Sequence, residues 1–214
     1  YGNYIIKSLD AGETWDGTNL PTDSGNEWAS LAWHALAIEV APEDPETIFI
    51  GGLELYRSTN GGLTWDNLSD WDLMYYGGGD RYVHADIHQI AFQPNSASSI
   101  AVTSDGGVFF STNSLDESDI VFIERNQGYN TLQFYTCDIS PEDGAEHFVG
   151  GLQDNGTLLF YNGELDINDM VTGGDGAFCF FDDNESILIT STYYNAWYVI
   201  NLDSGDYEYV GANS

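Results

Sequence analysis

Three side chains that can bind metal ions stand two residues apart at His84, Asp86 and His88. Alternate side chains of a β-strand lie on one face, so this spacing predicts two imidazoles and a carboxylate side by side. Such a set can hold a metal ion. The same residues can instead form hydrogen bonds to neighbouring strands, as polar side chains in a fold ordinarily do. Both interpretations stay open from the sequence.

Further polar residues recur at a fixed distance from the turns. Pro42, Pro94, Pro141 and Asp183 each follow an alternating apolar strand, and the residue eight positions earlier is polar in every case. Two turns between later strands add aspartates. We expect all these side chains at one end of the innermost strands, forming one ligand-binding face. Its members are His34, His84, Asp86, Gln133, Asp105, Asp154 and Asp175.

Two of these aspartates stand in glycine-containing turn sequences, Asp-Gly-Gly at 105–107 and Asp-Asn-Gly at 154–156. Such sequences are ordinary turns. Their carboxylate and carbonyl oxygens could also hold calcium. No EF-hand spacing is present. No cofactor is therefore certain, and calcium is the one that these loops suit.

The segments that must position these residues have the pattern of short β-strands. Apolar runs are brief, alternate with polar residues and end at Gly, Pro, Asn or Asp, as at 37–40, 47–50, 99–102 and 186–189. Helical periodicity is nearly absent. Glycine contributes 24 of the 214 residues, which is typical of a chain with many tight turns. The sequence therefore predicts an all-β fold.

The strands recur in a long repeat. The turn residues Pro42, Pro94, Pro141 and Asp183 are 52, 47 and 42 residues apart. Four strands at this period are typical of a β-propeller blade. We expect one partial β-propeller with about four and a half four-stranded antiparallel blades, a fragment of a larger ring. The predicted ranges are a half blade at 1–30 and blades at about 31–70, 80–126, 130–170 and 176–212 of residues 1–214.

Two turns carry the same pattern, S-x-[DN]-x-G-x-T-W, and a degenerate third copy begins at Asn201. This pattern resembles the Asp-box, or bacterial neuraminidase repeat. In it the Asp or Asn accepts hydrogen bonds from its own turn, Gly takes a positive φ and Trp packs between strands, which is a structural role. The sialidase-like fold does not imply sialidase activity, because too few arginines are present to bind a sialic acid carboxylate. The pattern residues are Ser8, Asp10, Gly12, Thr14, Trp15, Ser58, Asn60, Gly62, Thr64 and Trp65.

A wider resemblance covers residues 80–190 and rests on the segments 82–88, 104–108, 150–157 and 173–176. Their order is similar to secreted bacterial Asp-box propellers related to sortilin, the photosystem II assembly factor and xyloglucan-hydrolysing glycosidases. The resemblance implies a ring of about six to ten blades that the remainder of a longer polypeptide closes. It also implies an extracellular or cell-surface location. Many such proteins resemble type IX secretion cargo, whose C-terminal sorting domain this chain does not include.

The charge of the chain excludes two classes of partner. Thirty-five acidic residues against four basic ones give a formal net charge of −31. So few cations cannot neutralise a nucleic-acid backbone or bind an anionic membrane surface, and no apolar run is long enough to span a bilayer. The hydrophobic content of 42% still predicts a folded core. Such an acidic surface suits a saline or calcium-containing medium.

Two functions fit these features. The first is a secreted or cell-surface scaffold that binds polysaccharide or protein without catalysis. The second is a glycoside hydrolase, because 77–79, Pro94 and Asp105 reproduce the layout that carries one catalytic carboxylate in the xyloglucan-hydrolysing family. Glycosidases need two carboxylates, and Asp105 could pair with Asp86 or Asp154. In that family the second carboxylate comes from a separate propeller, so binding is favoured over catalysis. Aromatic residues expected near the face are Tyr75, Tyr76, Tyr82, Tyr135, Tyr193, Tyr194 and Trp197.

The two cysteines test the alignment of the repeat. Cys137 and Cys179 stand four residues before Pro141 and Asp183. We expect them to be buried neighbours on adjacent inner strands. A disulfide needs Cα atoms within about 7 Å, so free thiols are favoured over a bridge.

Overall fold

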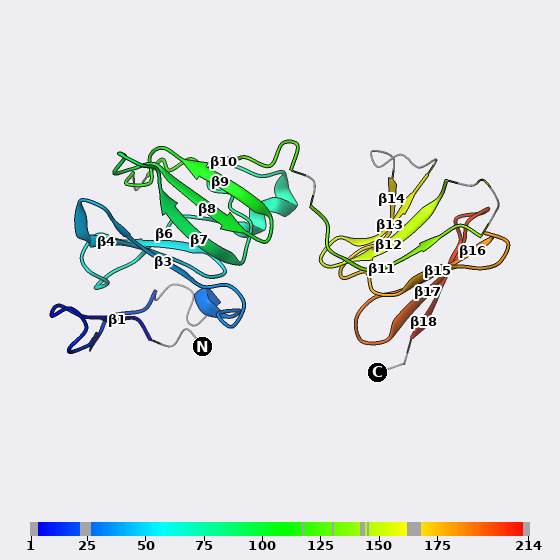
Figure 1. The fold of residues 1–214 in the computed structure, drawn as a ribbon, viewed down its shortest axis with the longest axis horizontal. Helices are drawn as coiled ribbons and strands as arrows, with labels where there is room; N and C mark the ends of the chain where they lie inside the picture. The colour runs from blue at the N-terminus through cyan, green and yellow to red at the C-terminus, as the bar shows by residue number, and fades with distance from the viewer. Residues whose placement is uncertain are drawn as a thin grey trace. The chain divides into compact units, whose positions relative to one another are not determined.

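The computed structural model shows a chain built almost entirely of β-strands and turns (Figure 1). Two compact units follow one another in the sequence, Tyr1–Tyr129 (unit 1) and Asn130–Ser214 (unit 2), and each is described by itself. The structure describes residues 4–21, 27–116, 118–129, 131–141, 144, 146–161 and 168–211.

Unit 1 contains two four-stranded antiparallel sheets among its described residues, and a two-stranded sheet precedes them. Each four-stranded sheet takes four consecutive strands in chain order. Two short 3-10 helices complete the unit. The elements are β1 (Ile6–Lys7), β2 (Asp16–Gly17), η1 (Glu27–Ala29), β3 (Ala37–Ala41), β4 (Asp44–Gly51), β5 (Leu55–Ser58), β6 (Asp66–Asn67), η2 (Trp71–Tyr76), β7 (Ile87–Phe92), β8 (Ile100–Ser104), β9 (Gly107–Ser111) and β10 (Ile123–Glu124).

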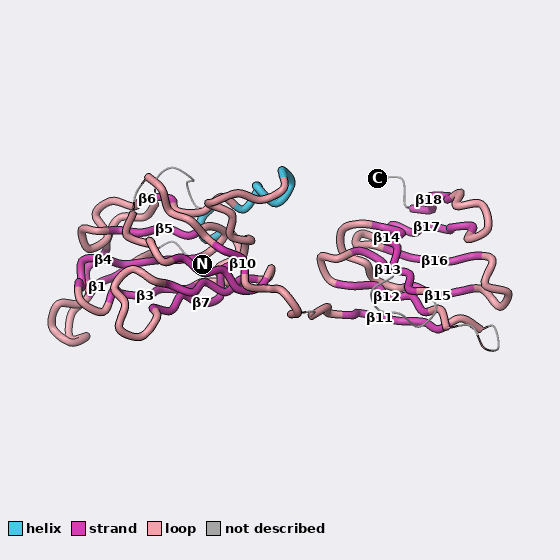
Figure 2. Tube along the Cα trace, turned by 90° about the horizontal axis from the view of Figure 1, so that it is seen from above, coloured by secondary structure: helices cyan, strands magenta, loops and turns pink. Residues whose placement is uncertain are grey.

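Unit 2 has the same construction, with two further sheets of four consecutive antiparallel strands in its described part. Strands and connecting loops make up most of both units, as the magenta and pink of Figure 2 show. The strands of unit 2 are β11 (Phe134–Ile139), β12 (Phe148–Leu152), β13 (Gly156–Phe160), β14 (Asn168–Thr172), β15 (Cys179–Phe181), β16 (Ile187–Ser191), β17 (Ala196–Asn201) and β18 (Tyr207–Gly211).

These repeated sheets define the fold class. Four antiparallel meanders of four strands, one after another in the described chain, are blades of a β-propeller, and β1–β2 supplies part of another blade. The predicted all-β propeller fold, present as part of a ring, is therefore confirmed. Among the described residues no helix is long and apolar enough to cross a membrane.

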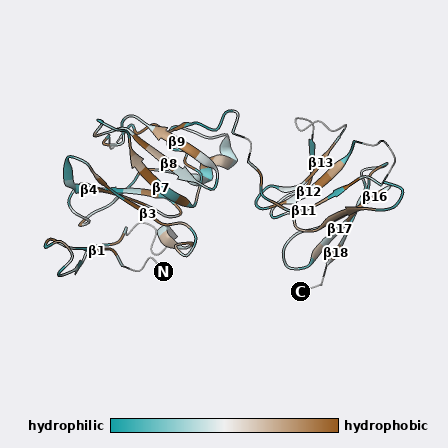
Figure 3. Ribbon diagram, viewed as in Figure 1, coloured by the Kyte–Doolittle hydropathy of each residue, from teal (hydrophilic) through white to brown (hydrophobic). Residues whose placement is uncertain are grey.

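Each unit has a hydrophobic core between its two four-stranded blades. In unit 1, Phe49 of β4, Ile87 and Ile90 of β7 and Phe109 of β9 are at most 3% exposed and belong to one cluster. Burying one such side chain contributes about 1.5–3 kcal/mol to stability. In Figure 3, hydrophobic residues, drawn in brown, are seen on strands such as β7 and β9. The corresponding cluster of unit 2 contains Val149, Leu159, Cys179, Phe181, Leu188 and Ile200.

Both cysteines are free thiols, as expected, but the predicted burial is wrong for one of them. Cys179 is buried and Cys137 is exposed. The Sγ of Cys179 on β15 lies 3.5 Å from the Thr136 Oγ1 of β11, so it points back to the preceding blade. Cys137 is the next residue after Thr136 and its side chain lies on the opposite face of β11. Within unit 2, the two equivalent positions therefore do not face one another.

The corresponding residues of unit 1 show the same relationship. Ile90 is 3% exposed because it packs against the preceding blade, whereas Ile38 is 60% exposed. In the second blade of each unit, this position therefore faces the first blade of the same unit. The prediction that equivalent positions face one another is wrong.

The S-x-[DN]-x-G-x-T-W turns are closed by their own side chains. In the first turn, Asp10 accepts hydrogen bonds from the hydroxyl and the backbone N of Thr14, at 2.6 and 2.8 Å. The backbone N of Gly12, at φ 91°, donates to Ser8 Oγ at 2.7 Å. The hydrogen bond from the Thr14 hydroxyl, followed by the other hydrogen bonds to the Asp10 carboxylate, lowers the pKa of Asp10 to about 2. The Asp side chain therefore holds the turn in its ionised form.

The second turn uses an amide in place of the carboxylate. Asn60 Oδ1 accepts the backbone N of Thr64 at 2.9 Å. The indole of Trp65 donates to the Asn19 carbonyl at 2.8 Å and packs against the hydrophobic cluster around Tyr56. Trp15 of the first turn was predicted to pack between strands, but this is wrong. Its side chain is 57% exposed, and its indole donates to the Gly12 carbonyl of its own turn.

Two more turns between third and fourth strands are also closed by asparagine side chains, with different partners. The degenerate copy closes when Asn201 Oδ1 accepts the backbone N of Ser204 at 2.9 Å. Between β9 and β10, Ser111 donates to Asn113 Oδ1 at 3.0 Å, and the same oxygen accepts the backbone N of Val121 at 3.1 Å. The sequence pattern misses this turn because the chain leaves the G-x-T-W consensus after Asn113.

Candidate functional site at the polar ends of the blades

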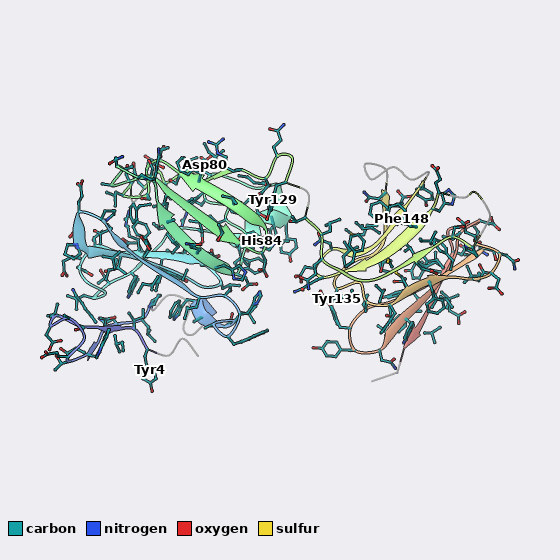
Figure 4. The ribbon with its side chains drawn as sticks, in the orientation of Figure 1. Tyr4, Asp80, His84, Tyr129, Tyr135 and Phe148 are labelled. Atoms are coloured by element: carbon teal, nitrogen blue, oxygen red, sulfur yellow. The ribbon has the colours of Figure 1, made fainter. Side chains whose placement is uncertain are left out.

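Two kinds of segment meet at one end of each blade. The segment leading into the first strand and the turn between the second and third strands lie together, because antiparallel pairing returns the second strand to where the first began. In unit 1 the backbone N of Ile87 also donates to the Gly52 carbonyl at 2.7 Å, which links the two blades there. We call these the polar ends of the blades; His84 in unit 1 and Tyr135 in unit 2 mark them in Figure 4.

His34, His88 and Asp105 form a compact cluster at the polar end of unit 1. Asp105 Oδ1 lies 2.5 Å from His88 Nε2, and Asp105 Oδ2 lies 3.3 Å from His34 Nε2. The two imidazole rings meet edge to face with their centroids 4.9 Å apart. One ligand atom from each residue lies within 4.8 Å of the others, and all three residues are exposed. Two imidazoles and a carboxylate thus converge where solvent can reach them.

Each member of this cluster comes from a different element. His34 ends a turn that precedes β3, His88 is the second residue of β7, and Asp105 begins the turn between β8 and β9. The backbone N of Asp105 donates to the Asp86 carbonyl at 3.3 Å, which fixes the turn against the segment before β7. The cluster therefore depends on two adjacent blades.

His84 does not join the cluster. Strand β7 begins at Ile87, and Asp86 before it has a φ of +64°, so the alternation of a strand does not extend back to residue 84. The ring of His84 covers Gly106 instead, where an added Cβ would lie 2.3 Å from His84 Cγ. The side chains of His84, Asp86 and His88 therefore do not lie side by side on one strand face, which was the reason for expecting a metal site there.

Asp86 supplies a second carboxylate beside the cluster. Desolvation and then the charge of Asp105 raise the pKa of Asp86, against a lowering by His34, His84 and His88. The Oδ1 of Asp86 is buried and has no hydrogen-bond partner. This carboxyl group is thus held close to the cluster by the fold.

The polar end of unit 2 brings Asp154 and Asp175 together. The backbone N of Asp154, in the turn between β12 and β13, donates to Asp175 Oδ1 at 2.8 Å. The carbonyl of Gln133, just before β11, accepts the backbone N of Gln153 at 3.0 Å. Desolvation, followed by the charges of Asp175 and Asp154, raises the pKa of Tyr135. The three residues expected from unit 2 therefore lie at one end of its blades, with a tyrosine beside them.

Close backbone contacts close this end of unit 2. The backbone N of Gly156 donates to the Gly174 carbonyl at 2.7 Å, and that of Gly176 to the Leu152 carbonyl at 2.8 Å. An added Cβ on Gly176 would lie 2.0 Å from the Gly156 carbonyl oxygen. Glycine is required here because two backbones approach without room for a side chain.

Exposed aromatic side chains flank both polar ends. Trp33 is 68% exposed and its ring centroid lies 5.5 Å from that of His34. In the turn between β16 and β17, Tyr194 is 93% exposed and stands edge to face with Tyr193. The Tyr193 ring lies against Gly174. Each unit therefore presents an aromatic surface next to its polar residues.

A further concave surface in unit 2 was not signalled by the sequence. A cavity of about 460 Å³ lies between strands β13–β14 and β17–β18, with Tyr161, Asp169, Tyr198 and Tyr207 in its lining. Desolvation, then the charge of Asp169, raises the pKa of Tyr161. Because its residues come from four strands in two blades, no spacing along the chain points to it.

Solved propeller structures resemble the chain at low similarity. The chain is 19% identical to an ancestral GH74 enzyme, with a TM-score of 0.37 over 98% of this chain and 28% of that chain. It is 14% identical to the GH74 xyloglucanase from Xanthomonas campestris, with a TM-score of 0.42 over 99% and 34%. For YCF48 bound to D1 peptide the identity is 13% and the TM-score 0.39, over 98% and 63%.

The chain thus spans about a third of the length of these GH74 enzymes. No family profile matches the sequence, and no curated protein matches it. The class of the protein, a β-propeller of four-stranded antiparallel blades, follows from its own sheets.

Proposed function

We propose that this chain is a binding scaffold whose polar ends take a neutral polysaccharide. The observation that carries the proposal is the pairing of exposed aromatic rings with hydrogen-bonding groups at both ends: Trp33 beside His34, and Tyr193 with Tyr194 near Gly174. Aromatic faces pack on the apolar C–H faces of sugar rings, while carboxylates, amides and imidazoles bind sugar hydroxyls.

The charge of the polar ends favours an uncharged ligand. Asp86 and Asp105 lie at the polar end of unit 1, and Asp154 and Asp175 at that of unit 2. An acidic sugar would meet like charge there, which costs binding free energy. The basic residues are engaged elsewhere: Lys7 with Glu46, Arg57 with the Ser114 carbonyl, Arg81 with the Asn67 carbonyl and Arg125 over the Phe110 ring.

The proposal is tested with a panel of neutral polysaccharides, acidic polysaccharides and extended peptides in affinity electrophoresis and calorimetry. We expect binding to a neutral polysaccharide, and a loss of at least about fivefold in affinity for Trp33→Ala or Tyr194→Ala, which is about 1 kcal/mol. Tyr207→Ala is the matched control. Tyr207 is 70% exposed but begins β18, at the opposite end of the same blade as Tyr194.

Three outcomes would contradict this proposal. They are binding to peptides alone, preference for acidic polysaccharides, or an equal loss in Tyr207→Ala. A peptide preference would favour the protein-binding form of the scaffold.

The proximity of Asp86 to Asp105 favours a second candidate, glycoside hydrolysis. Glycosidases place two carboxyl groups on either side of the bond that breaks, and the fold supplies a neighbour for Asp105 within unit 1. This candidate predicts release of reducing ends from a neutral polysaccharide by the wild type. Asp105→Asn and Asp86→Asn would abolish the release, while Asp154→Asn in unit 2 would keep it. Absence of release from the whole panel would exclude it.

We also infer that the S-x-[DN]-x-G-x-T-W turns are Asp-boxes, and that the chain belongs to a secreted or cell-surface polypeptide related to the sortilin-type propellers. The shared hydrogen bonds of Asp10 and Asn60 with Thr14 and Thr64 support the first inference. The formal net charge of −31 supports the second. Fractionation of the source cells with an antibody to the chain tests the location, and an exclusively internal pool would contradict it.

A further inference from the structure

We propose that His34, His88 and Asp105 form a binding site for a divalent transition-metal ion, with Zn²⁺ as the ion that fits best. The site is independent of the proposed polysaccharide binding, because it stands on the geometry of these three residues alone. It also differs from the set that strand spacing predicts, since His34 and Asp105 take the places of His84 and Asp86.

The geometry suits one ion held by three ligands. His34 Nε2, His88 Nε2 and an Asp105 oxygen lie within 4.8 Å of one another. Ligand atoms at the usual distance of about 2.0–2.1 Å around a tetrahedral zinc ion stand roughly 3.3 Å apart. The 3.3 Å between His34 Nε2 and Asp105 Oδ2 already has this value. Only exposed side chains would need to adjust.

The types of ligand atom select the class of ion. Two imidazoles with one carboxylate suit zinc and its neighbours in the first transition series, whereas calcium takes oxygen ligands. All three residues are exposed, so an ion has a path of entry and an open position for water or a ligand. The ligand atoms of this cluster thus favour a transition-metal ion over calcium.

The surroundings add negative charge. Asp86 Oδ1 is buried without a hydrogen-bond partner, and the backbone of Asp86 also holds the Asp105 turn through its carbonyl. A second carboxyl group next to the ligands favours a cation over an empty set of two imidazoles. The basic side chains contact other groups, namely Glu46 for Lys7, the Ser114 carbonyl for Arg57, the Asn67 carbonyl for Arg81 and the Phe110 ring for Arg125.

The experiment is a calorimetric titration of the EDTA-treated, buffer-exchanged chain with ZnCl₂, with CaCl₂ in parallel. We expect one zinc equivalent per chain and at least about a tenfold loss of affinity in His34→Ala and in His88→Ala. Cobalt provides a second readout. Co²⁺ should give the visible absorption of a four-coordinate site in the wild type and lose it in both variants.

Two matched controls separate this site from other histidines. His147→Ala removes a histidine that is paired with Glu185 in unit 2, and we expect it to bind zinc as the wild type does. His84→Ala tests the set that strand spacing predicts, and it should also retain zinc. Circular dichroism establishes that each variant is folded. The cobalt spectrum of the wild type tests the site without any substitution.

The proposal is overturned if the wild type takes up no zinc equivalent, if His34→Ala and His88→Ala bind zinc unchanged, or if calcium binds there more tightly than zinc. In those cases the three residues form a hydrogen-bonded cluster only. Failure here would leave the polysaccharide proposal untouched, because its panel is measured separately and, for this comparison, on the EDTA-treated chain without added metal.

Discussion

The two units place polar residues at the same end of their blades but give those ends different chemistry. Unit 1 carries two imidazoles around Asp105, and the ring of His84 packs on the adjacent turn. Unit 2 carries Asp154 and Asp175 with Tyr135 nearby, and its turns pack backbone against backbone. The repeat therefore determines where a position points, while the residue type at that position determines what it can bind.

The same contrast holds for the hydrophobic positions. Four residues before each turn residue, the second blade of each unit buries its side chain, as Ile90 and Cys179 do. The first blade of each unit exposes the equivalent, as Ile38 and Cys137 do. Within each unit, this position therefore adds to the hydrophobic core only in the second blade, where the first blade covers it.

The largest expected effect tests this difference in unit 1. Ile90→Ala removes a buried side chain from between two blades and should lower the free energy of unfolding by about 2–5 kcal/mol. Ile38→Ala removes the equivalent exposed side chain and should cost less than about 1 kcal/mol. Urea unfolding of both variants measures the difference. Equal losses would contradict the assigned direction of this position.

A second prediction compares two glycines at the polar end of unit 2. Gly176→Ala would force a Cβ against the Gly156 carbonyl, so we expect a loss of about 1–3 kcal/mol or more. Gly173→Ala, in the same segment between β14 and β15, would meet no atom within 4 Å, so its cost in stability should be smaller. Thermal unfolding of the two variants is the measurement. An equal loss for Gly173→Ala would show that the close backbone contact of Gly176 is not what requires glycine in this segment.

A third prediction uses the turns at the opposite ends of the blades. Because the folded pKa of Asp10 is lowered to about 2 from 3.8, its contribution to stability is present above pH 4 and is lost as the pH falls towards 2. Asn201, which closes the corresponding turn in unit 2, does not titrate. Asp10→Asn should therefore remove part of the fall in melting temperature over this range, and Asn201→Asp should add to it. An unchanged pH profile in Asp10→Asn would contradict the hydrogen bonds assigned to this turn.

The smallest effect on stability is expected for the cysteines, where reactivity is the better measure. Burial raises the pKa of the Cys179 thiol and also shields it. Cys137 is exposed. A disulfide reagent should modify one thiol quickly in the folded chain, and Cys137→Ala should abolish that fast phase. Two thiols of equal rate would contradict the exposure of Cys137 on β11 and the burial of Cys179 on β15.

Much of the fold could be predicted because residues close together in the sequence determine its strands and turns. Alternating strands, turn residues and a repeat of 42 to 52 residues indicate four-stranded blades without reference to distant contacts. The side chain hydrogen bonds of Asp10 and Asn60 also lie within a few residues of their own position. The predicted burial of Cys137 and of Trp15 was wrong. Whether a side chain is buried depends on contacts with residues distant in the sequence, which a local pattern does not contain.

The site was predicted in composition but not in detail. His34 and Asp105 were expected at one end from their positions in the repeat, yet they are 71 residues apart, and no spacing reveals their hydrogen bond. His84 and His88 do not share one strand face, because β7 begins only at Ile87 and Asp86 before it has a positive φ. A backbone conformation of this kind is not encoded in a two-residue alternation.

Backbone amide NMR tests whether ligands bind at the polar ends of the blades. The assigned chain is titrated with the neutral oligosaccharide that binds best in the panel. We expect chemical-shift changes concentrated at residues 33–34, 104–106, 133–135 and 193–195, and none at the turns 8–15 and 58–65 at the opposite ends. Shifts centred on those opposite turns, or on the cavity lined by Tyr198 and Tyr207, would contradict it.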